Sequence, residues 1–168
     1  MTCLDIQISV EAGGWPPEDD MQALAENVLG KTAEFLSANE KQPFPKVTPE
    51  LSLVFTDDAA IREINAEWRK QDKPTNVLSF PAFPVTPGKM PGPMLGDIVL
   101  ACETLVREAD DLGKPFDEHL THLLVHGFLH LFGYDHIETD DAIKMEGLET
   151  RILASLGLSD PYADSDAV

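Results

Sequence analysis

The sequence predicts one globular domain in which about five α-helices accompany four short β-strands. Four segments show the alternation of apolar and polar residues, or the short apolar run, that is typical of strands. Most of the segments between them repeat apolar residues at helical spacing. With 168 residues, 43% of them hydrophobic, the chain can bury one core, and neither a repeat nor a linker divides it. We therefore expect a single domain over residues 1–158 and a disordered tail over 159–168.

The first half of the chain is expected to contain two strands and two helices. Residues 4–10 alternate apolar and polar side chains and predict a half-buried strand, and residues 19–37 predict an amphipathic helix. Residues 51–55 predict the second strand. The polar residues 56–58 can cap the N-terminus of the next helix, which should end before Pro74.

The second half is expected to contain two strands and three helices. Short strands are predicted at 77–80 and 95–100, and the apolar run of the latter indicates burial on both faces. The segment 81–95 holds five prolines and two glycines, so it should form an irregular loop of the kind that often borders a site. The three helices are expected at about 101–112, from about Asp117 onward, and at about 139–156.

Three of the five histidines lie within eleven residues and form a candidate metal site. On a helix, His126 and His130 are four residues apart and project from the same face. Gly133 can adopt the left-handed conformation and end that helix, so that His136 can fold back toward the other two. Three neutral imidazoles can bind a zinc-like ion and leave a fourth position for water, as in metallohydrolases.

Two observations limit this interpretation. Zinc proteases with the pattern His-Glu-x-x-His carry their general base directly after the first histidine, whereas this chain has Gly127 there. The base must then come from elsewhere, or the metal-bound hydroxide must suffice, which weakens the protease interpretation. The apolar residues around the histidine pair would also suit an ordinary buried helix.

The charge distribution separates a small basic segment from an acidic body. The formal net charge of −18 argues against general binding to nucleic acid, whose phosphates attract positive charge. A basic strip nevertheless lies within twelve positions and comprises Arg62, Arg69, Lys70 and Lys73. This basic strip is either a local approach path for a polyanion or an ordinary exposed helix end.

The remaining signals concern the cellular compartment. Cys3 and Cys102 suggest no disulfide framework, and their use fits a reducing cytosol. The N-terminus shows no signal-peptide pattern, and no apolar run is long enough for a membrane span. We therefore expect a cytoplasmic protein that does not enter a membrane.

Three segments of the chain, taken together, resemble the YbeY-type ribosomal RNA maturation factors. They are residues 126–136 (HGFLHLFGYDH), 69–81 (RKQDKPTNVLSFP) and 95–99 (LGDIV), in the order found in that family. The resemblance covers roughly residues 51–162, and the loop 81–95 is its least similar part.

The resemblance implies a zinc-dependent, single-strand-specific endoribonuclease that acts in small-subunit rRNA 3′-end maturation and ribosome quality control. It implies one zinc-type ion per chain on His126, His130 and His136, and a functional Arg69 in a positively charged channel. On this basis we expect Arg69 and His126 to be the catalytic residues. The implied partners are single-stranded RNA and the small ribosomal subunit or one of its proteins. The implied fold is α+β with a small mixed sheet and a zincin-like metal helix, and the four predicted strands agree with it independently.

The residues themselves support this chemistry and leave alternatives. A metal ion can supply Lewis acidity and an activated water, and the Arg69 guanidinium can bind phosphate oxygens bidentately. A small metalloprotease remains an alternative, as does a non-catalytic ribosome-assembly factor whose acidic surface binds a protein.

Four further polar residues receive provisional roles. His122 lies on the same helical face as His126 and is expected to be structural or to support a ligand, while His119 is expected on the surface. Asp97 is expected to bond the loop backbone or to orient a ligand. Asp135 is expected to shape the turn before His136, with steering of a substrate as the alternative.

Overall fold

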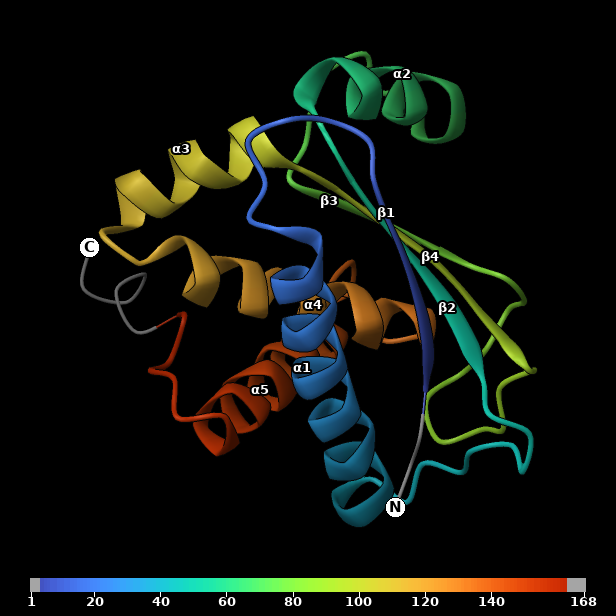
Figure 1. Ribbon diagram of the computed structural model, residues 1–168. Coiled ribbons are helices and arrows are strands. Elements are labelled where there is room, and N and C mark those ends of the chain that lie inside the picture. Colours follow the sequence, from blue (N-terminus) through green and yellow to red (C-terminus); the bar gives the residue numbers. More distant parts are fainter. Residues whose placement is uncertain (1–3, 163–168) are drawn as a thin grey trace.

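The computed structural model describes residues 4–162, and its four strands form one mixed sheet in the order β1-β2-β4-β3 (Figure 1). The strands span Asp5–Val10 (β1), Glu50–Thr56 (β2), Val77–Pro81 (β3) and Met94–Ala101 (β4). Strands β1, β2 and β4 run parallel, and β3 runs antiparallel to β4 at one edge of the sheet. The predicted α+β fold with a small mixed four-stranded sheet is confirmed.

Five helices surround this sheet in the described part of the chain. They span Glu18–Asn39 (α1), Asp58–Arg69 (α2), Cys102–Leu112 (α3), Phe116–Leu131 (α4) and Thr139–Ser155 (α5). Helix α2 covers one face, where Ile61 packs with Val99 and Ala101. Helices α1, α4 and α5 lie on the opposite side of the sheet (Figure 1).

Helix α4 is the central helix of the fold, in contact with β3, β4, α1, α3 and α5. Its apolar side chains point in most directions, as expected of a helix that is enclosed on most sides. Leu120, Val125 and Phe128 are fully buried. His126 and His130 are only partly buried, so the histidine face of α4 is the face that remains open.

The structure confirms the predicted element order and several local details. Asp57 caps α2 by accepting a 2.9 Å hydrogen bond from the backbone N–H of Ala60. Cys102 is a buried free cysteine. The prediction that His119 lies on the surface is wrong. Only 5% of this residue is exposed, because α3 packs over α4 there, and its Nε2 lies 2.9 Å from Oε1 of Glu108.

Two predictions concern segments outside the regular elements. The loop 81–95 is irregular apart from its strand ends, and the buried Gln42 anchors it by donating to the Lys89 carbonyl and accepting from the Gly88 N–H. The predicted tail lies partly outside the described residues, namely at 163–168. Among residues 4–162, no helix has both the length and the apolar character needed to cross a lipid bilayer.

Candidate metal centre and cleft

The structure brings His126, His130 and His136 together at the open face of α4. One nitrogen from each ring lies within 4.8 Å of the others, and the Nε2 atoms of His126 and His130 are 3.2 Å apart. Tetrahedral zinc with nitrogen ligands at about 2.0–2.1 Å holds two such nitrogens about 3.3 Å apart. The three imidazoles therefore fit the donor set and spacing of a zinc-type site.

A glycine turn carries His136 back toward the helix. Gly133 has a φ of +94°, and a Cβ built there would overlap the carbonyl oxygen of Val85. Only glycine fits both the left-handed backbone and this close approach. The loop 81–95 thus supports the turn that places the third histidine, a contact that the sequence did not reveal.

Gly127 marks the closest approach of α4 to the sheet. A Cβ at this position would lie 3.0 Å from both Ile98 Cγ2 and Ser79 Oγ, and the Ser79 hydroxyl donates a 2.9 Å bond to the Gly127 carbonyl. This packing explains why the position of the zinc-protease glutamate is glycine here. A longer side chain would require Ile98 and Ser79 to move.

Arg69 stands at the end of α2 and borders the same cleft as the three histidines. The cleft has a volume of about 610 Å³, and β3 forms one of its walls. Arg69 Nη2 donates a 2.7 Å hydrogen bond to the Ser79 carbonyl, and its guanidinium carbon lies 4.9 Å from the Phe80 ring centre. The guanidinium is therefore held at the edge of β3.

The basic strip is smaller than the sequence suggests. Arg62 pairs with Asp72 at 2.9 Å, and both side chains are exposed. Arg69, Lys70 and Lys73 remain at the exposed end of α2 and the segment after it. Of these three cations, Arg69 lines the cleft.

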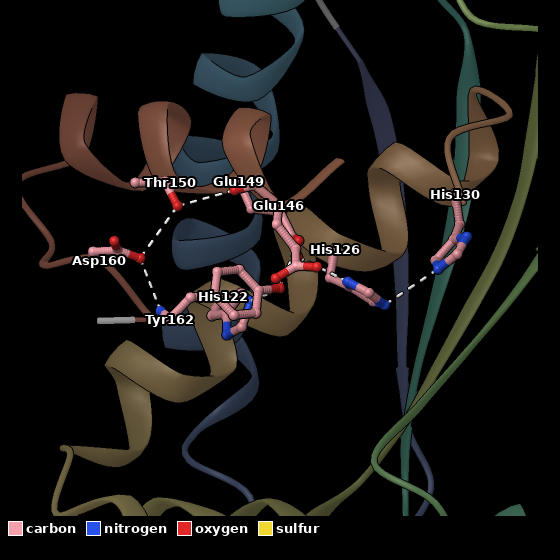
Figure 2. A network of polar contacts seen from close by, with 8 residues as sticks. All are labelled: His122, His126, His130, Glu146, Glu149, Thr150, Asp160 and Tyr162. Carbon is pink, nitrogen blue, oxygen red and sulfur yellow. Dashed lines mark hydrogen bonds and ion pairs between the residues drawn. The ribbon is translucent and has the colours of Figure 1, made fainter. Parts of the chain in front are cut away.

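A buried carboxylate lies behind His126 (Figure 2). Glu149 of α5 is fully buried, and its oxygens lie 2.8 Å from His126 Nδ1 and 3.2 Å from His122 Nε2. The Tyr162 hydroxyl donates a 2.7 Å bond to Oε2 of Glu149. His122 is therefore a supporting residue, as expected, and Glu149 and Tyr162 are additions to the predicted site.

The protonation of the site follows from these contacts. Burial alone would raise the pKa of Glu149, but hydrogen bonds from His122 and His126 outweigh it and lower the pKa to about 2. Burial, with repulsion from His126 and His136, lowers the pKa of His130 to about 4. His130 is therefore neutral near pH 7, which is the form that binds a metal ion.

The two aspartates have different outcomes. Asp135 accepts a 3.2 Å bond from the Ile137 N–H, so its role in shaping the turn is confirmed. Of the two roles expected of Asp97, orienting a ligand of the histidine cluster does not fit the structure. Neighbouring side chains on a strand point to opposite faces, and Ile98 points toward α4, so Asp97 faces away from the histidines.

A second polar chain connects the cleft to α3. Asn76, which lines the cleft, donates a 3.0 Å hydrogen bond to Glu108, and Glu108 in turn contacts His119. Sequence spacing gave no sign of this chain because its members come from three separate elements. For Glu149 a signal did exist, since it is an acid on the apolar face of α5 between Leu148 and Ile152.

Comparison with known proteins gives a consistent result. A family model described as "Endoribonuclease YbeY" matches residues 7–157. A protein of that name from Sinorhizobium fredii is 74% identical over the whole chain, which covers 97% of the relative. Another from Rhizobium meliloti is 76% identical over 164 residues, covering 98% of both proteins.

The fold is also similar to a solved structure. The solution structure of TM1509 from Thermotoga maritima aligns with a TM-score of 0.53 and 23% sequence identity. The alignment covers 93% of this chain and 97% of that protein. At this level of identity the similarity supports the α+β fold.

Proposed function

The chain belongs to the endoribonuclease YbeY family, and from this premise we propose that it is a zinc-dependent hydrolase that cleaves single-stranded RNA. Its substrate is small-subunit ribosomal RNA, and its cytoplasmic role is 3′-end maturation and ribosome quality control. The observation that carries this proposal is the cleft shared by Arg69 and the three histidines.

The residues of the cleft have two different roles, metal binding and phosphate binding. His126, His130 and His136 would hold the ion, and zinc suits three imidazole nitrogens. When bound, such an ion supplies Lewis acidity and a nucleophile at neutral pH. Arg69 binds the non-bridging phosphate oxygens and stabilises the charge that develops on them.

The contacts of Arg69 suit this role. Its bond to the Ser79 carbonyl fixes one end of the guanidinium at the rim, and the residue remains exposed to the cleft. A fixed donor loses little conformational freedom when it binds phosphate, and its planar fork matches the oxygens of the group.

The acidic surface favours delivery of the RNA by a protein partner. The net charge is −18, and α5 begins with Asp140 and Asp141 at exposed positions. Such a surface would repel free RNA and attract a basic ribosomal protein. The same observation supports the alternative of a non-catalytic assembly factor, whereas the close packing at Gly127 disfavours a protease of the His-Glu-x-x-His type.

A substrate comparison tests these alternatives. Zinc-loaded protein and its His130→Ala variant would be incubated with single-stranded RNA, with duplex RNA and with casein. Cleavage of single-stranded RNA alone, lost in the variant, supports the proposal. Equal cleavage by parent and variant, or cleavage of casein, would contradict it.

A further inference from the structure

The buried carboxylate of Glu149 joins the candidate metal centre to the C-terminal segment (Figure 2). It receives three contacts, from His126 Nδ1, His122 Nε2 and the Tyr162 hydroxyl. Its side chain is only 1% exposed, so these groups replace the water that an ionised carboxylate requires. These three contacts stabilise the negative charge of the buried carboxylate.

The contact to His126 fixes which ring nitrogen carries the proton. An ionised carboxylate only accepts hydrogen bonds, so Nδ1 of His126 must donate to Glu149. The free lone pair then lies on Nε2, which faces His130 Nε2 at 3.2 Å. This is the tautomer and the orientation that a metal ion on the three histidines needs.

Tyr162 fixes Glu149 in turn. The hydroxyl donates to Oε2, the oxygen that the two histidines leave free, and the ring packs 5.6 Å from His122 in an edge-on arrangement. Burial, followed by the charge of Glu149, raises the pKa of Tyr162, so the hydroxyl keeps its proton. Tyr162 lies beyond the residues matched by the family model, which end at 157.

We infer that Glu149 is the positioning residue of the metal centre and that Tyr162 completes it by locking the carboxylate against His126. This inference rests on the proposed metal-dependent function and adds the residues that prepare one ligand for the ion. The chain at Tyr162 then contributes to the metal centre by holding the Glu149 carboxylate in place.

The effect is specific to one ligand. Among residues 4–162, Glu149 is the carboxylate that contacts a histidine of the triad, and that histidine is His126 at 2.8 Å. Loss of Glu149 should therefore free the His126 ring and leave the other two ligands in place. A site with two ordered ligands binds zinc more weakly than one with three.

Zinc affinity, measured by competition with a chromophoric chelator, tests the inference on the full chain. Glu149→Gln keeps the shape of the side chain but removes its charge, and should weaken zinc binding about 10–100-fold. Tyr162→Phe removes only the hydroxyl and should weaken binding several-fold. The matched control is Glu118→Gln, which makes the same change at a partly buried position in the first turn of α4, away from the triad, and should bind zinc like the parent.

A second measurement, of the His126 tautomer, needs no zinc. In the zinc-free chain labelled with ¹⁵N, ring correlation spectra should place the His126 proton on Nδ1. In Glu149→Gln the same spectra should show a mixture of tautomers, with Nε2–H increased. Melting curves identify any variant that has lost its fold. If Glu149→Gln does not fold, the zinc affinity and the His126 tautomer of Tyr162→Phe decide whether the inference holds.

The outcomes separate this inference from the nuclease proposal. Weaker zinc binding and an altered His126 tautomer in Glu149→Gln support it, even if no RNA is cleaved by the parent. Parental zinc affinity and an unchanged tautomer in Glu149→Gln would overturn it, whatever the activity. If Glu118→Gln weakened zinc binding equally, the cause would be the loss of a negative charge anywhere on the protein, and the positioning role would be refuted.

Discussion

Arg69 donates a hydrogen bond of 2.7 Å to the backbone carbonyl of Ser79, and so the end of α2 is joined to the edge strand β3 beside the histidine cluster. This bond holds a cation at the rim of the cleft and leaves the residue exposed. The contact explains how a residue 57 positions before His126 comes to serve the same site.

We predict that Arg69→Ala lowers RNA cleavage by about 10²–10³-fold, the usual effect of removing a donor that stabilises transition-state charge. Melting temperature and zinc content should stay close to the parent, because the side chain is exposed. Arg69→Lys should restore little, since an ammonium lacks the planar fork. The control is Arg62→Ala on the same helix, whose partner is Asp72 and which should keep full activity. Parental cleavage by Arg69→Ala would remove Arg69 from the mechanism.

We predict about one zinc ion per chain, bound through the three histidines. Elemental analysis of the purified protein should show this ratio, and replacement of any two of the three histidines by alanine should abolish it. The reason is that a single imidazole cannot retain zinc against a chelator. His119→Ala serves as the control, because that ring is held by Glu108 away from the cluster. Full zinc retention in the double variants would refute the site.

RNA binding should depend only weakly on salt. Arg69 lines the cleft, and the exposed Lys70 and Lys73 follow it in the chain. Each phosphate contact that these three cations make with single-stranded nucleic acid contributes about −0.7 to the slope of log affinity against log salt. We therefore expect a slope of about −2 and weak binding to naked RNA at physiological salt. Binding measured across a salt series should become much tighter when small-subunit particles are present. Tight binding to naked RNA would contradict delivery by a partner but would leave the metal site intact.

Substitution of Gly133, which is not itself a ligand, should weaken zinc binding by displacing His136. Gly133→Ala places a Cβ in the left-handed region, which costs at least about 1–2 kcal/mol, and drives it into the Val85 carbonyl. We expect a lower melting temperature and weaker zinc binding, because His136 moves with the turn. Gly147→Ala is the matched control, since its Cβ would meet nothing within 4 Å. That helical position should gain about 0.5–1 kcal/mol.

Protonation of Glu108 should contribute to the loss of folding stability at acidic pH. The hydrogen bond from His119 outweighs burial and lowers the pKa of Glu108 in the folded state. A lowered folded-state pKa means that the contribution is present above the unfolded pKa, about 4.3, and is lost as the pH falls below it. Denaturant unfolding of Glu108→Gln and the parent should differ at pH 7 and converge toward pH 3. A difference that stayed constant with pH would exclude this linkage.

The elements of the fold could be predicted because their signals are local. Alternation in β1, helical spacing in α1 and the cap at Asp57 each depend on residues close in sequence. The same holds for the histidine triad, since a helical turn and a glycine suffice to bring its members together. Their spacing was visible without any knowledge of the sheet.

The errors and omissions arise where distant elements meet. His119 was misplaced because nothing in its own segment shows that α3 covers it. Asp97 was misjudged because the face of β4 that meets α4 is set by packing. Glu149 was overlooked because its partners stand 23 and 27 residues earlier on another helix. The local sequence pattern thus predicted the three histidine ligands. The residues that hold those ligands in place could be identified only from the tertiary structure.

The tight packing at Gly127 also bears on how such sites diverge in evolution. A glutamate at residue 127 would require Ile98 and Ser79 to move, because a Cβ there already lies 3.0 Å from a side-chain atom of each. These two side chains belong to β4 and β3, so a change at residue 127 has to be matched by changes in the sheet. The spacing between α4 and these two strands thus limits which side chains can stand beside the three histidines.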